Sequence, residues 1–130
     1  MVHNVKLGKN MRSVSIVGIG ATPFFNGVQN ETYKGLTNGE LFGHAALDAM
    51  KDAGVEPRDV QYFFHGSANP HVLNNCITPN LQVADWFGMR GKGSLSHSEG
   101  CCTGYIALEE AVFAVASGAY DVVLLSLIHI

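Results

Sequence analysis

The sequence predicts an α/β fold organised around a mainly parallel sheet. Short apolar runs rich in β-branched residues alternate with helical segments, in the order strand, helix, strand, helix, strand, helix, strand. Residues 121–126 are apolar nearly throughout, which is typical of a strand buried on both faces. Strands that alternate with helices are joined by right-handed crossovers within a parallel sheet. These observations favour a single βαβαβαβ unit.

Four strands are expected. The first, residues 13–20, reads SVSIVGIG and ends in glycines. The others are residues 60–66, residues 93–98, which give a weaker pattern, and residues 121–126. Turn-forming residues follow each of the first two runs, so the strands have clear ends.

The first helix has the most complete local signals. Thr37 and Glu40 form a T-x-x-E capping box, in which each side chain satisfies a free backbone N–H of the first turn. Gly54 is placed to end the helix in a left-handed conformation, and Pro57 prevents its continuation. We therefore expect a helix that begins after Thr37 and ends at Gly54.

Two further helices follow. Thr78-Pro79 has the favoured order of cap and proline for a helix start. The last helix, residues 101–117, is closed by Gly118 and carries only two charges, Glu109 and Glu110. A helix that is apolar nearly all round is typically buried. One sheet has little to bury it under, so we expect a second layer from another domain or another subunit.

Composition limits the classes of function. The chain has 130 residues, 47% hydrophobic and 15% charged, with a net charge of −3 and no Lys/Arg run, which argues against nucleic acid as a partner. It has no stretch of 18 apolar residues, so we expect no membrane span. Residues 1–12 are too polar for a secretory signal and are read as a flexible leader. Three cysteines without framework spacing favour a reducing cytoplasm.

Cys101 and Cys102 are adjacent at the start of the last helix. A helix N-terminus offers free N–H groups and the positive end of the helix dipole, which favour a thiolate and an oxyanion. Thr103 and Gly104 are small and leave room for a substrate, whereas the Glu99 carboxylate disfavours a thiolate. Buried cysteines are also common packing residues, so the residue types alone leave both interpretations open.

The surrounding residues resemble the nucleophile motif of the thiolase superfamily. In that motif a cysteine is followed by a small residue, then Ser or Thr, then Gly, with Ala-Leu a few residues on, as in CCTGYIAL from Cys101 to Leu108. The segments VSIVGIGATPF, LFGHAALDAMKDAGVEPRDVQYFFHG and SGAYDVVLLS also resemble the family, in order and in spacing. The resemblance covers nearly all of residues 13–126.

The resemblance implies a thiolase-like layer with a buried nucleophile helix, truncated within an amino-terminal half. It implies that Cys101 is the nucleophile, since its register accounts for Gly104 and for Ala107-Leu108, and that Cys102 is a packing residue. The substrate would be a coenzyme A thioester, with no tightly bound cofactor and no metal. General bases, including a histidine and a second cysteine, would come from a second half, so this length of chain would be inactive alone. The full-length protein would be a homodimer or tetramer.

The end of the chain departs from the family pattern. Thiolases usually carry Gly-Gly-x-Glu after this last strand, whereas this sequence continues as SLIHI. We therefore divide the chain into a leader (residues 1–12), an incomplete thiolase-like domain (residues 13–126) and a non-native tail (residues 127–130).

Three alternatives remain open. A ketoacyl-synthase III or hydroxymethylglutaryl-CoA-synthase-like enzyme would use the same fold, and Cys102 followed by Thr103-Gly104 resembles the Cys-Ala-Gly pattern of the former. A thiolase-fold subunit without catalytic activity would use both cysteines structurally. A nucleotide-binding domain is suggested by Gly18-Ile19-Gly20 after a strand, but the third glycine of the fingerprint is missing.

Several other residues are weaker candidates. His65 and His71 flank the loop HGSANPH at the carboxyl end of a strand, where open α/β sheets bind ligands, but a polar loop is the simpler interpretation. His97 precedes Cys101 by four residues and is expected to be structural. No spacing of histidines with Cys76 or the cysteine pair supports a metal site. Trp86 and Phe87, at the end of the second helix, are expected in the core.

Overall fold

The computed structural model describes residues 10–23, 35–68 and 78–128. The elements follow one another in this order: α1 (Asn38–Ala53), β1 (Tyr62–Ser67), α3 (Pro79–Trp86), β2 (Gly93–His97), the short 3₁₀ turn η1 (Gly100–Cys102), α4 (Thr103–Ala116) and β3 (Val123–Ile128). Three of the four predicted strands and all three predicted helices are thus present, with bounds shifted by at most two residues.

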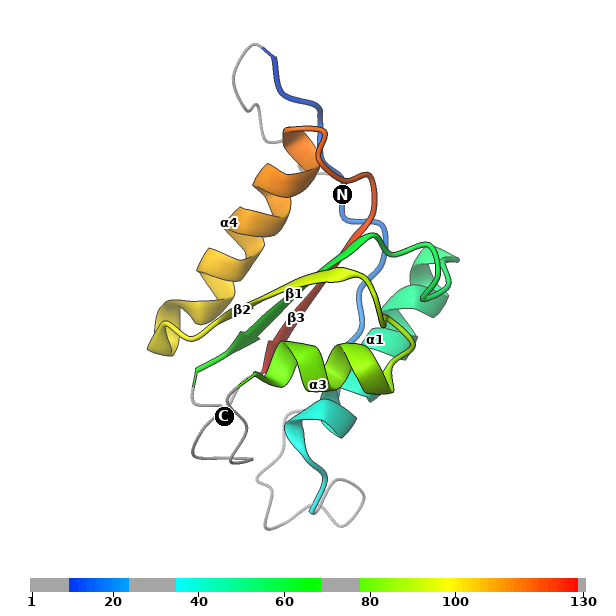
Figure 1. Cartoon of the computed structure of the whole chain (residues 1–130), viewed down its shortest axis with the longest axis vertical. Coiled ribbons are helices and arrows are strands. Elements are labelled where there is room, and N and C mark those ends of the chain that lie inside the picture. Colours follow the sequence, from blue (N-terminus) through cyan, green and yellow to red (C-terminus); the bar gives the residue numbers. More distant parts are fainter. Residues whose placement is uncertain (1–9, 24–34, 69–77, 129–130) are drawn as a thin grey trace.

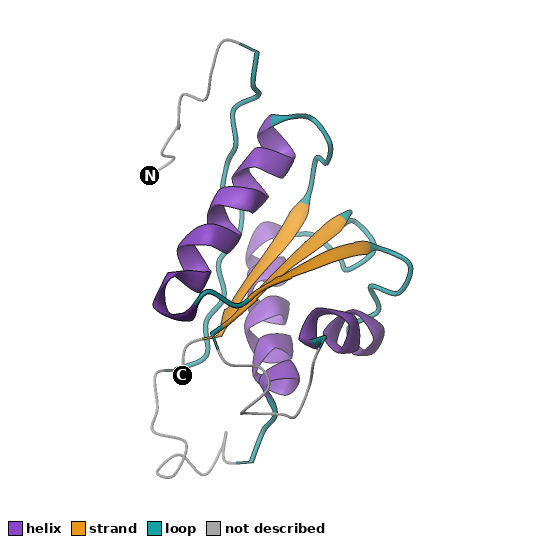
Figure 2. Cartoon of the chain, turned by 60° about the vertical axis from the view of Figure 1, so that its left-hand side comes forward, coloured by secondary structure: helices purple, strands orange, loops and turns teal. Residues whose placement is uncertain are grey.

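The described strands form one parallel sheet in the order β2-β1-β3. In the register, His65 of β1 lies between Ser96 of β2 and Ser126 of β3. Helices α1 and α3 cover one face of this sheet and α4 covers the other (Figures 1 and 2). The predicted α/β class with a parallel sheet is therefore confirmed, and the carboxyl ends of all three strands meet at one edge.

Helix α1 begins and ends where its local signals predicted. The backbone N–H of Thr37 donates to Glu40 Oε2 at 2.7 Å, and the N–H of Glu40 donates back to Thr37 Oγ1 at 3.3 Å. These bonds also hold the pKa of Glu40 below its ordinary value, because they favour the charged carboxylate. Gly54 ends the helix with a φ of 69°, a conformation that glycine adopts without strain.

The main core lies between the sheet and the pair α1 and α3. In this core Phe42 of α1 packs against Phe63 of β1, with ring centroids 5.1 Å apart. The buried residues of this core are Phe42, Ala46, Met50, Val60, Phe63, Val83, Ala84, Met89 and Leu124. Their burial on one face of the sheet fixes which strand positions turn toward α1.

Helix α4 rests on the opposite face through small side chains. Thr103, Ala107, Ala111 and Ala116 are its buried residues, and they let the helix approach the backbone of β1 and β3 closely. The other side of α4 is open, with Tyr105 71% exposed and Leu108 and Phe113 also exposed. In the described part of the chain, three strands cover only one stripe of the expected nucleophile helix, so its full burial would require the expected second layer. The expected second layer stays a prediction.

The predicted first strand is also wrong. Residues 13–20 pair with no strand in the described part of the chain. They pass alongside α1 instead, where a Cβ added at Gly18 would overlap the Ala49 carbonyl oxygen and one at Gly20 would overlap that of Ala45. The two glycines thus allow a close approach to a helix. The β-branched pattern that predicted a strand leaves Ile16, Val17 and Ile19 exposed.

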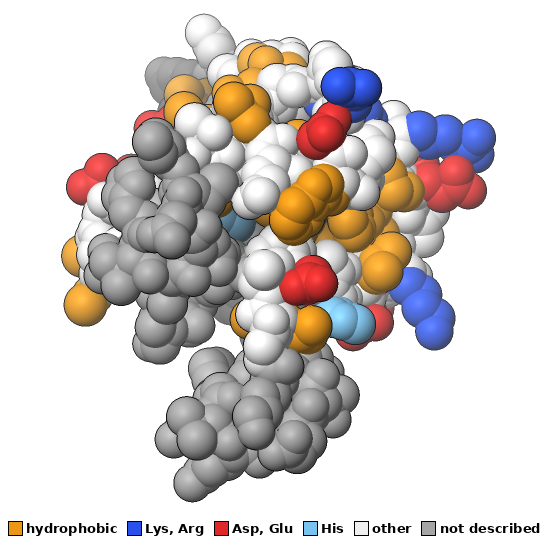
Figure 3. All heavy atoms as spheres, turned by 60° about the horizontal axis from the view of Figure 1, so that its bottom comes forward, with side chains coloured by type: hydrophobic (Ala, Val, Ile, Leu, Met, Phe, Trp, Pro, Cys, Tyr) orange, Lys and Arg blue, Asp and Glu red, His pale blue; other side chains and the backbone are white. Residues whose placement is uncertain are grey.

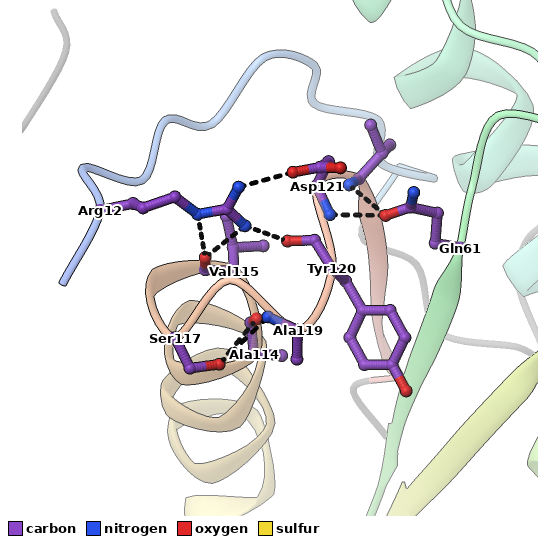
Figure 4. A network of polar contacts seen from close by, with 9 residues as sticks. Arg12, Gln61, Ala114, Val115, Ser117, Ala119, Tyr120 and Asp121 are labelled. Carbon is purple, nitrogen blue, oxygen red and sulfur yellow. Dashed lines mark hydrogen bonds and ion pairs between the residues drawn. The ribbon is translucent and has the colours of Figure 1, made fainter.

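Arg12 fastens this same segment to the far end of α4 (Figure 4). Its guanidinium donates to the carbonyl oxygens of Val115 at 2.9 Å and Tyr120 at 2.6 Å, and forms an ion pair with Asp121. Its backbone N–H donates to the Ala116 carbonyl oxygen at 2.9 Å. Arg12, assigned to the leader from the sequence, therefore caps the carboxyl end of a helix, while residues 1–9 lie outside the described residues.

The last strand begins and ends two residues later than expected. β3 runs to Ile128, so Leu127 and Ile128 continue its pairing with Gly66 and Ser67 of β1. Both residues belong to the tail that the sequence assigned as non-native, and residues 129–130 lie outside the described part. The origin of that tail stays a prediction.

Candidate active site

Both cysteines of the pair lie in the turn that connects β2 to α4. Cys101 and Cys102 belong to η1, which runs directly into Thr103, the first residue of α4. Both are free and exposed. Because β2 ends at the carboxyl edge of the sheet, this turn places two thiols at that edge, next to the first turn of a helix whose N–H groups lack helical partners.

The side chain of Thr103 closes this turn. Its hydroxyl oxygen accepts a hydrogen bond from the Glu99 N–H at 2.8 Å and donates one to the Gly100 carbonyl oxygen at 2.7 Å. Thr103 is only 4% exposed and points toward β1, where a Cβ added at Gly66 would lie 3.0 Å from its Cγ2. Thr103 was expected to leave room for a substrate. It is instead an internal support of the turn.

Cys102 differs from its expected role. The sequence assigned it to packing, but it is exposed like Cys101, and no residue of η1 is buried. The reason is that the 3₁₀ turn lies at the edge of the sheet, where both thiols are exposed to solvent. Exposure therefore does not distinguish the two cysteines, and their assignment rests on the sequence register alone.

His97 lies at the end of β2, just before the turn. Its ring is stacked on that of Phe64, with centroids 6.3 Å apart and an interplanar angle of 15°. Its Nε2 is buried without a hydrogen-bond partner in the described part of the chain. This stacking on the α4 side of the sheet agrees with the structural role that was expected for His97.

His65 lies inside β1, within the predicted strand 60–66, rather than beside a ligand-binding loop. It is fully buried beside Phe42 and Phe63, and neither ring nitrogen has a hydrogen-bond partner among the described residues. Burial disfavours the charged imidazolium and lowers the pKa of His65 to about 4. A neutral histidine on the α1 face of the sheet is a core residue. The run of apolar neighbours in YFFHG was the sequence signal for the burial of His65.

The remaining sequence candidates divide into two groups. His71 and Cys76 lie outside the described residues. Gly18 and Gly20, the glycines of the possible nucleotide fingerprint, face α1, and the Ile19 N–H donates to Asp52 Oδ2 at 3.0 Å. They therefore serve helix packing rather than a phosphate. Among the described residues, no group of three His, Cys, Asp or Glu side chains could hold a metal ion.

Trp86 and Phe87 have different surroundings. Phe87 packs against the core, with its ring 5.3 Å from that of Phe42, as expected. Trp86 was also expected in the core, but it is 58% exposed and lies over Gly39 of α1. The end of α3 turns its two aromatic residues in different directions, and only Phe87 reaches inward.

One face of the molecule carries charged side chains of both signs (Figure 3). In the face shown in Figure 3, Lys and Arg side chains lie close to acidic ones, and apolar groups are scattered between them. In the described part of the chain, no helix is long and apolar enough to span a membrane.

Comparison with known proteins finds acetyl-CoA acetyltransferases that are similar to this chain. No family model matches the chain. Acetyl-CoA acetyltransferases of Methanothermobacter thermautotrophicus and Methanocaldococcus jannaschii are 27% and 29% identical to it over 114 residues, which is 88% of this chain. An acetyl-CoA acetyltransferase structure from Syntrophomonas wolfei superposes with a TM-score of 0.72 at 23% identity, over 82% of this chain and 26% of that one. Over most of its length the chain is therefore similar to acetyl-CoA acetyltransferases.

The chain matches only part of these relatives. It spans 28% of the length of the two curated acetyl-CoA acetyltransferases. Its three-stranded parallel sheet with helices on both faces resembles the fold of part of the Syntrophomonas wolfei structure.

Two contributors to the site were not recognised from the sequence. One is the Thr103 hydroxyl as a clamp on the turn, and the other is Gly66, which makes space for the Thr103 methyl group. A glycine inside a strand is a signal for close approach of another element, and Gly66 gave that signal.

Proposed function

We propose that this chain carries the nucleophile of a thiolase-type acyltransferase, and that the nucleophile is the Cys101 thiolate. The observation that carries the proposal is an exposed thiol in the turn that opens α4, in a chain similar to acetyl-CoA acetyltransferases. The register of Cys101 with Gly104 and Ala107-Leu108 favours it over Cys102.

The first chemical step follows from the position of the thiol. The Cys101 sulfur attacks the carbonyl carbon of an acyl-CoA thioester, and a new carbon–sulfur bond forms. The bond to the coenzyme A sulfur then breaks, and the coenzyme A thiolate takes up a proton. Backbone N–H groups of the first turn of α4 are suited to stabilise the oxyanion that forms on the way. The product is an acyl-enzyme.

The second step determines the direction of the reaction. In synthesis, the α-carbanion of a second acyl-CoA attacks the acyl-enzyme carbonyl, forms a carbon–carbon bond and releases Cys101. In degradation, Cys101 attacks the keto carbon of a β-ketoacyl-CoA, whose Cα–Cβ bond breaks, and the departing acyl-CoA carbanion takes up a proton. Free coenzyme A then removes the acyl group from Cys101.

Proton transfer in both directions needs a base within reach of a substrate bound at Cys101. His65 does not meet this need, because it is buried against Phe42 on the face of the sheet opposite α4. We therefore propose that the base and a second cysteine belong to a further half, and that this length of chain does not turn over alone. A homodimer or tetramer in the cytoplasm is part of the same proposal.

The test uses the complete enzyme incubated with radiolabelled acetyl-CoA and quenched in acid. Cys101→Ser should abolish the acyl-enzyme, because serine is a much weaker nucleophile without a dedicated base. Cys102→Ser is the matched control and should retain the label. Loss of the label in Cys102→Ser but not in Cys101→Ser would transfer the role to Cys102, and absence of label from the unsubstituted enzyme would favour a subunit without catalytic activity.

A further inference from the structure

Thr103 occupies a special position in the turn that holds the candidate nucleophile. Its hydroxyl bonds to the backbone on the far side of both cysteines, accepting from the Glu99 N–H and donating to the Gly100 carbonyl oxygen. The Cys102 N–H donates to the Glu99 carbonyl oxygen at 3.2 Å within the same turn. Cys101 therefore lies inside a loop that one buried side chain closes.

The backbone of this turn needs support from a side chain. Gly100 has a φ of 57°, in the left-handed region, and η1 is a single turn of 3₁₀ helix with no side-chain cap of its own. Such short turns have few internal hydrogen bonds. The two bonds from the Thr103 hydroxyl supply the missing constraints at the start of the turn.

The methyl group of Thr103 determines where its hydroxyl points. A Cβ placed on Gly66 would lie 3.0 Å from Thr103 Cγ2, so the methyl fills the space that the glycine leaves on β1. A β-branched side chain has few allowed rotamers, and a seated methyl selects one of them. The hydroxyl is thereby aimed at the turn by contact with the sheet.

We infer that Thr103 is a positioning residue for Cys101. It links the central strand to the Glu99–Gly100 backbone, and so fixes the place from which the Cys101 sulfur meets an electrophile. This inference rests on the proposed function for its biological meaning, but the mechanical link is tested without acyl transfer.

The experiment measures the rate of Cys101 alkylation by iodoacetamide in the 130-residue chain with Cys102→Ser as background, read by peptide mass spectrometry. Thr103→Val keeps the shape and the methyl but removes both hydrogen bonds. It should slow alkylation of Cys101 by about fivefold, which is the factor that corresponds to the net free energy of one typical hydrogen bond. Thr103→Ser keeps the hydroxyl and should stay within about twofold of the parent.

The matched control removes a hydroxyl at the other end of the same helix. Ser117 Oγ donates to the Ala114 carbonyl oxygen at 3.1 Å, so Ser117→Ala should leave the Cys101 rate unchanged. Amide hydrogen exchange in the same samples adds a second readout. In Thr103→Val, exchange should accelerate from Glu99 to Cys102 but not in β1, which separates a loosened turn from general unfolding.

A second pair of variants keeps the inference testable if Thr103→Val does not fold. Gly66→Ala pushes on the Thr103 methyl from the strand and should slow alkylation of Cys101. Adding Thr103→Ser removes that methyl and should restore the rate. An unchanged Cys101 rate in Thr103→Val, or no restoration in the double variant, would overturn the inference. Retention of acyl-enzyme by Cys101→Ser would instead overturn the proposed function and leave the link between Thr103 and the turn intact.

Discussion

Arg12 and Asp121 lie 109 residues apart in the sequence, and Arg12 Nη1 is 2.6 Å from Asp121 Oδ1. The hydrogen bond and the charge of Arg12 hold the pKa of Asp121 below its ordinary value of 3.8, with a smaller contribution from Gln61. The pair joins the segment that leads to α1 to the turn between α4 and β3. The ion pair therefore connects the segment that lies on α1, on one face of the sheet, to the end of α4 on the other face.

Removing Arg12 should raise the pKa of Asp121 toward 3.8, since the carboxylate loses its main stabilising partner. Carboxyl titration by NMR in Arg12→Met measures this directly. A carboxyl with a lowered folded pKa adds stability at neutral pH and loses it as the pH falls through that pKa. Arg58→Met, at an arginine paired elsewhere with Glu56, is the control. An identical Asp121 titration in Arg12→Met would show that the ion pair does not persist in solution.

His65 should make the fold sensitive to mild acid. In the unfolded chain its pKa is about 6.5, and in the folded protein it is about 4, so the unfolded state binds more protons between these values. The contribution of His65 to the free energy of unfolding is fully present above pH 7. The free energy of unfolding should fall by about 3 kcal/mol as the pH decreases to 4. Urea unfolding across this range should show the decline in the parent and a much flatter profile in His65→Gln.

His97→Gln is the comparison variant, because it removes a histidine from the neighbouring strand and leaves His65 in place. Its profile should keep the decline of the parent. Equal slopes of stability against pH in the parent and in His65→Gln would mean that His65 is protonated in the folded protein as readily as in the unfolded chain.

Lys92 should be among the most important charged residues for stability. Its ammonium donates to the carbonyl oxygens of Pro57 at 2.7 Å, Arg58 at 2.8 Å and Val60, and so it closes the loop before β1. Lys92→Met removes all three bonds and leaves the Val60 end of the strand unsupported. We expect a loss of about 2 kcal/mol in the free energy of unfolding, measured with urea.

Lys51, in the last turn of α1, provides the matched control. Lys51→Met removes the same charge from an exposed site and should change stability by about 0.5 kcal/mol or less. Similar losses in the two variants would indicate a general effect of charge rather than the three carbonyl contacts.

Gly39 and Gly43, one helical turn apart on α1, face Trp86 and Phe87. A Cβ at Gly39 would lie 3.0 Å from Trp86 Cζ3, whereas one at Gly43 would lie 3.7 Å from Phe87 Cε2, an ordinary contact. Gly43→Ala should therefore stabilise the protein by up to about 1 kcal/mol through helix propensity. Gly39→Ala should gain less, because the Trp86 ring must move.

Trp86 is the sole tryptophan of the chain, so its fluorescence reports on this contact. Gly39→Ala should shift the emission to longer wavelength as the ring moves into water, and Gly43→Ala should leave the emission unchanged. An unchanged spectrum together with equal stabilisation in both variants would contradict the packing of Trp86 on Gly39.

Local signals explain why much of the fold was predictable. Thr37 with Glu40 and Gly54 mark the ends of α1, and the order Thr78-Pro79 marks the start of α3. These signals depend on bonds within one helical turn, so the sequence contains all the participants. The location of Cys101 and Cys102 at a helix start was predictable for the same reason.

The failures have a different cause. Residues 13–20 have the composition of a strand, but a strand also needs a partner edge, and here the segment lies on α1. The exposure of Trp86 and of Cys102 likewise depends on the direction that a helix end or turn faces, and the burial of His65 depends on α1 packing against its face of β1. None of these is a property of neighbouring residues alone.

The sequence by itself determined the α/β class, the ends of the helices and the thiolase-like register around Cys101, because short-range hydrogen bonding and hydrophobic period specify them. Only the tertiary structure decided the strand order β2-β1-β3, the neutral burial of His65 and the clamp that Thr103 forms between Gly66 and the cysteine turn. Those features arise where segments distant in sequence come into contact. Their free energy depends on burial and distance in three dimensions, which residue order alone does not specify.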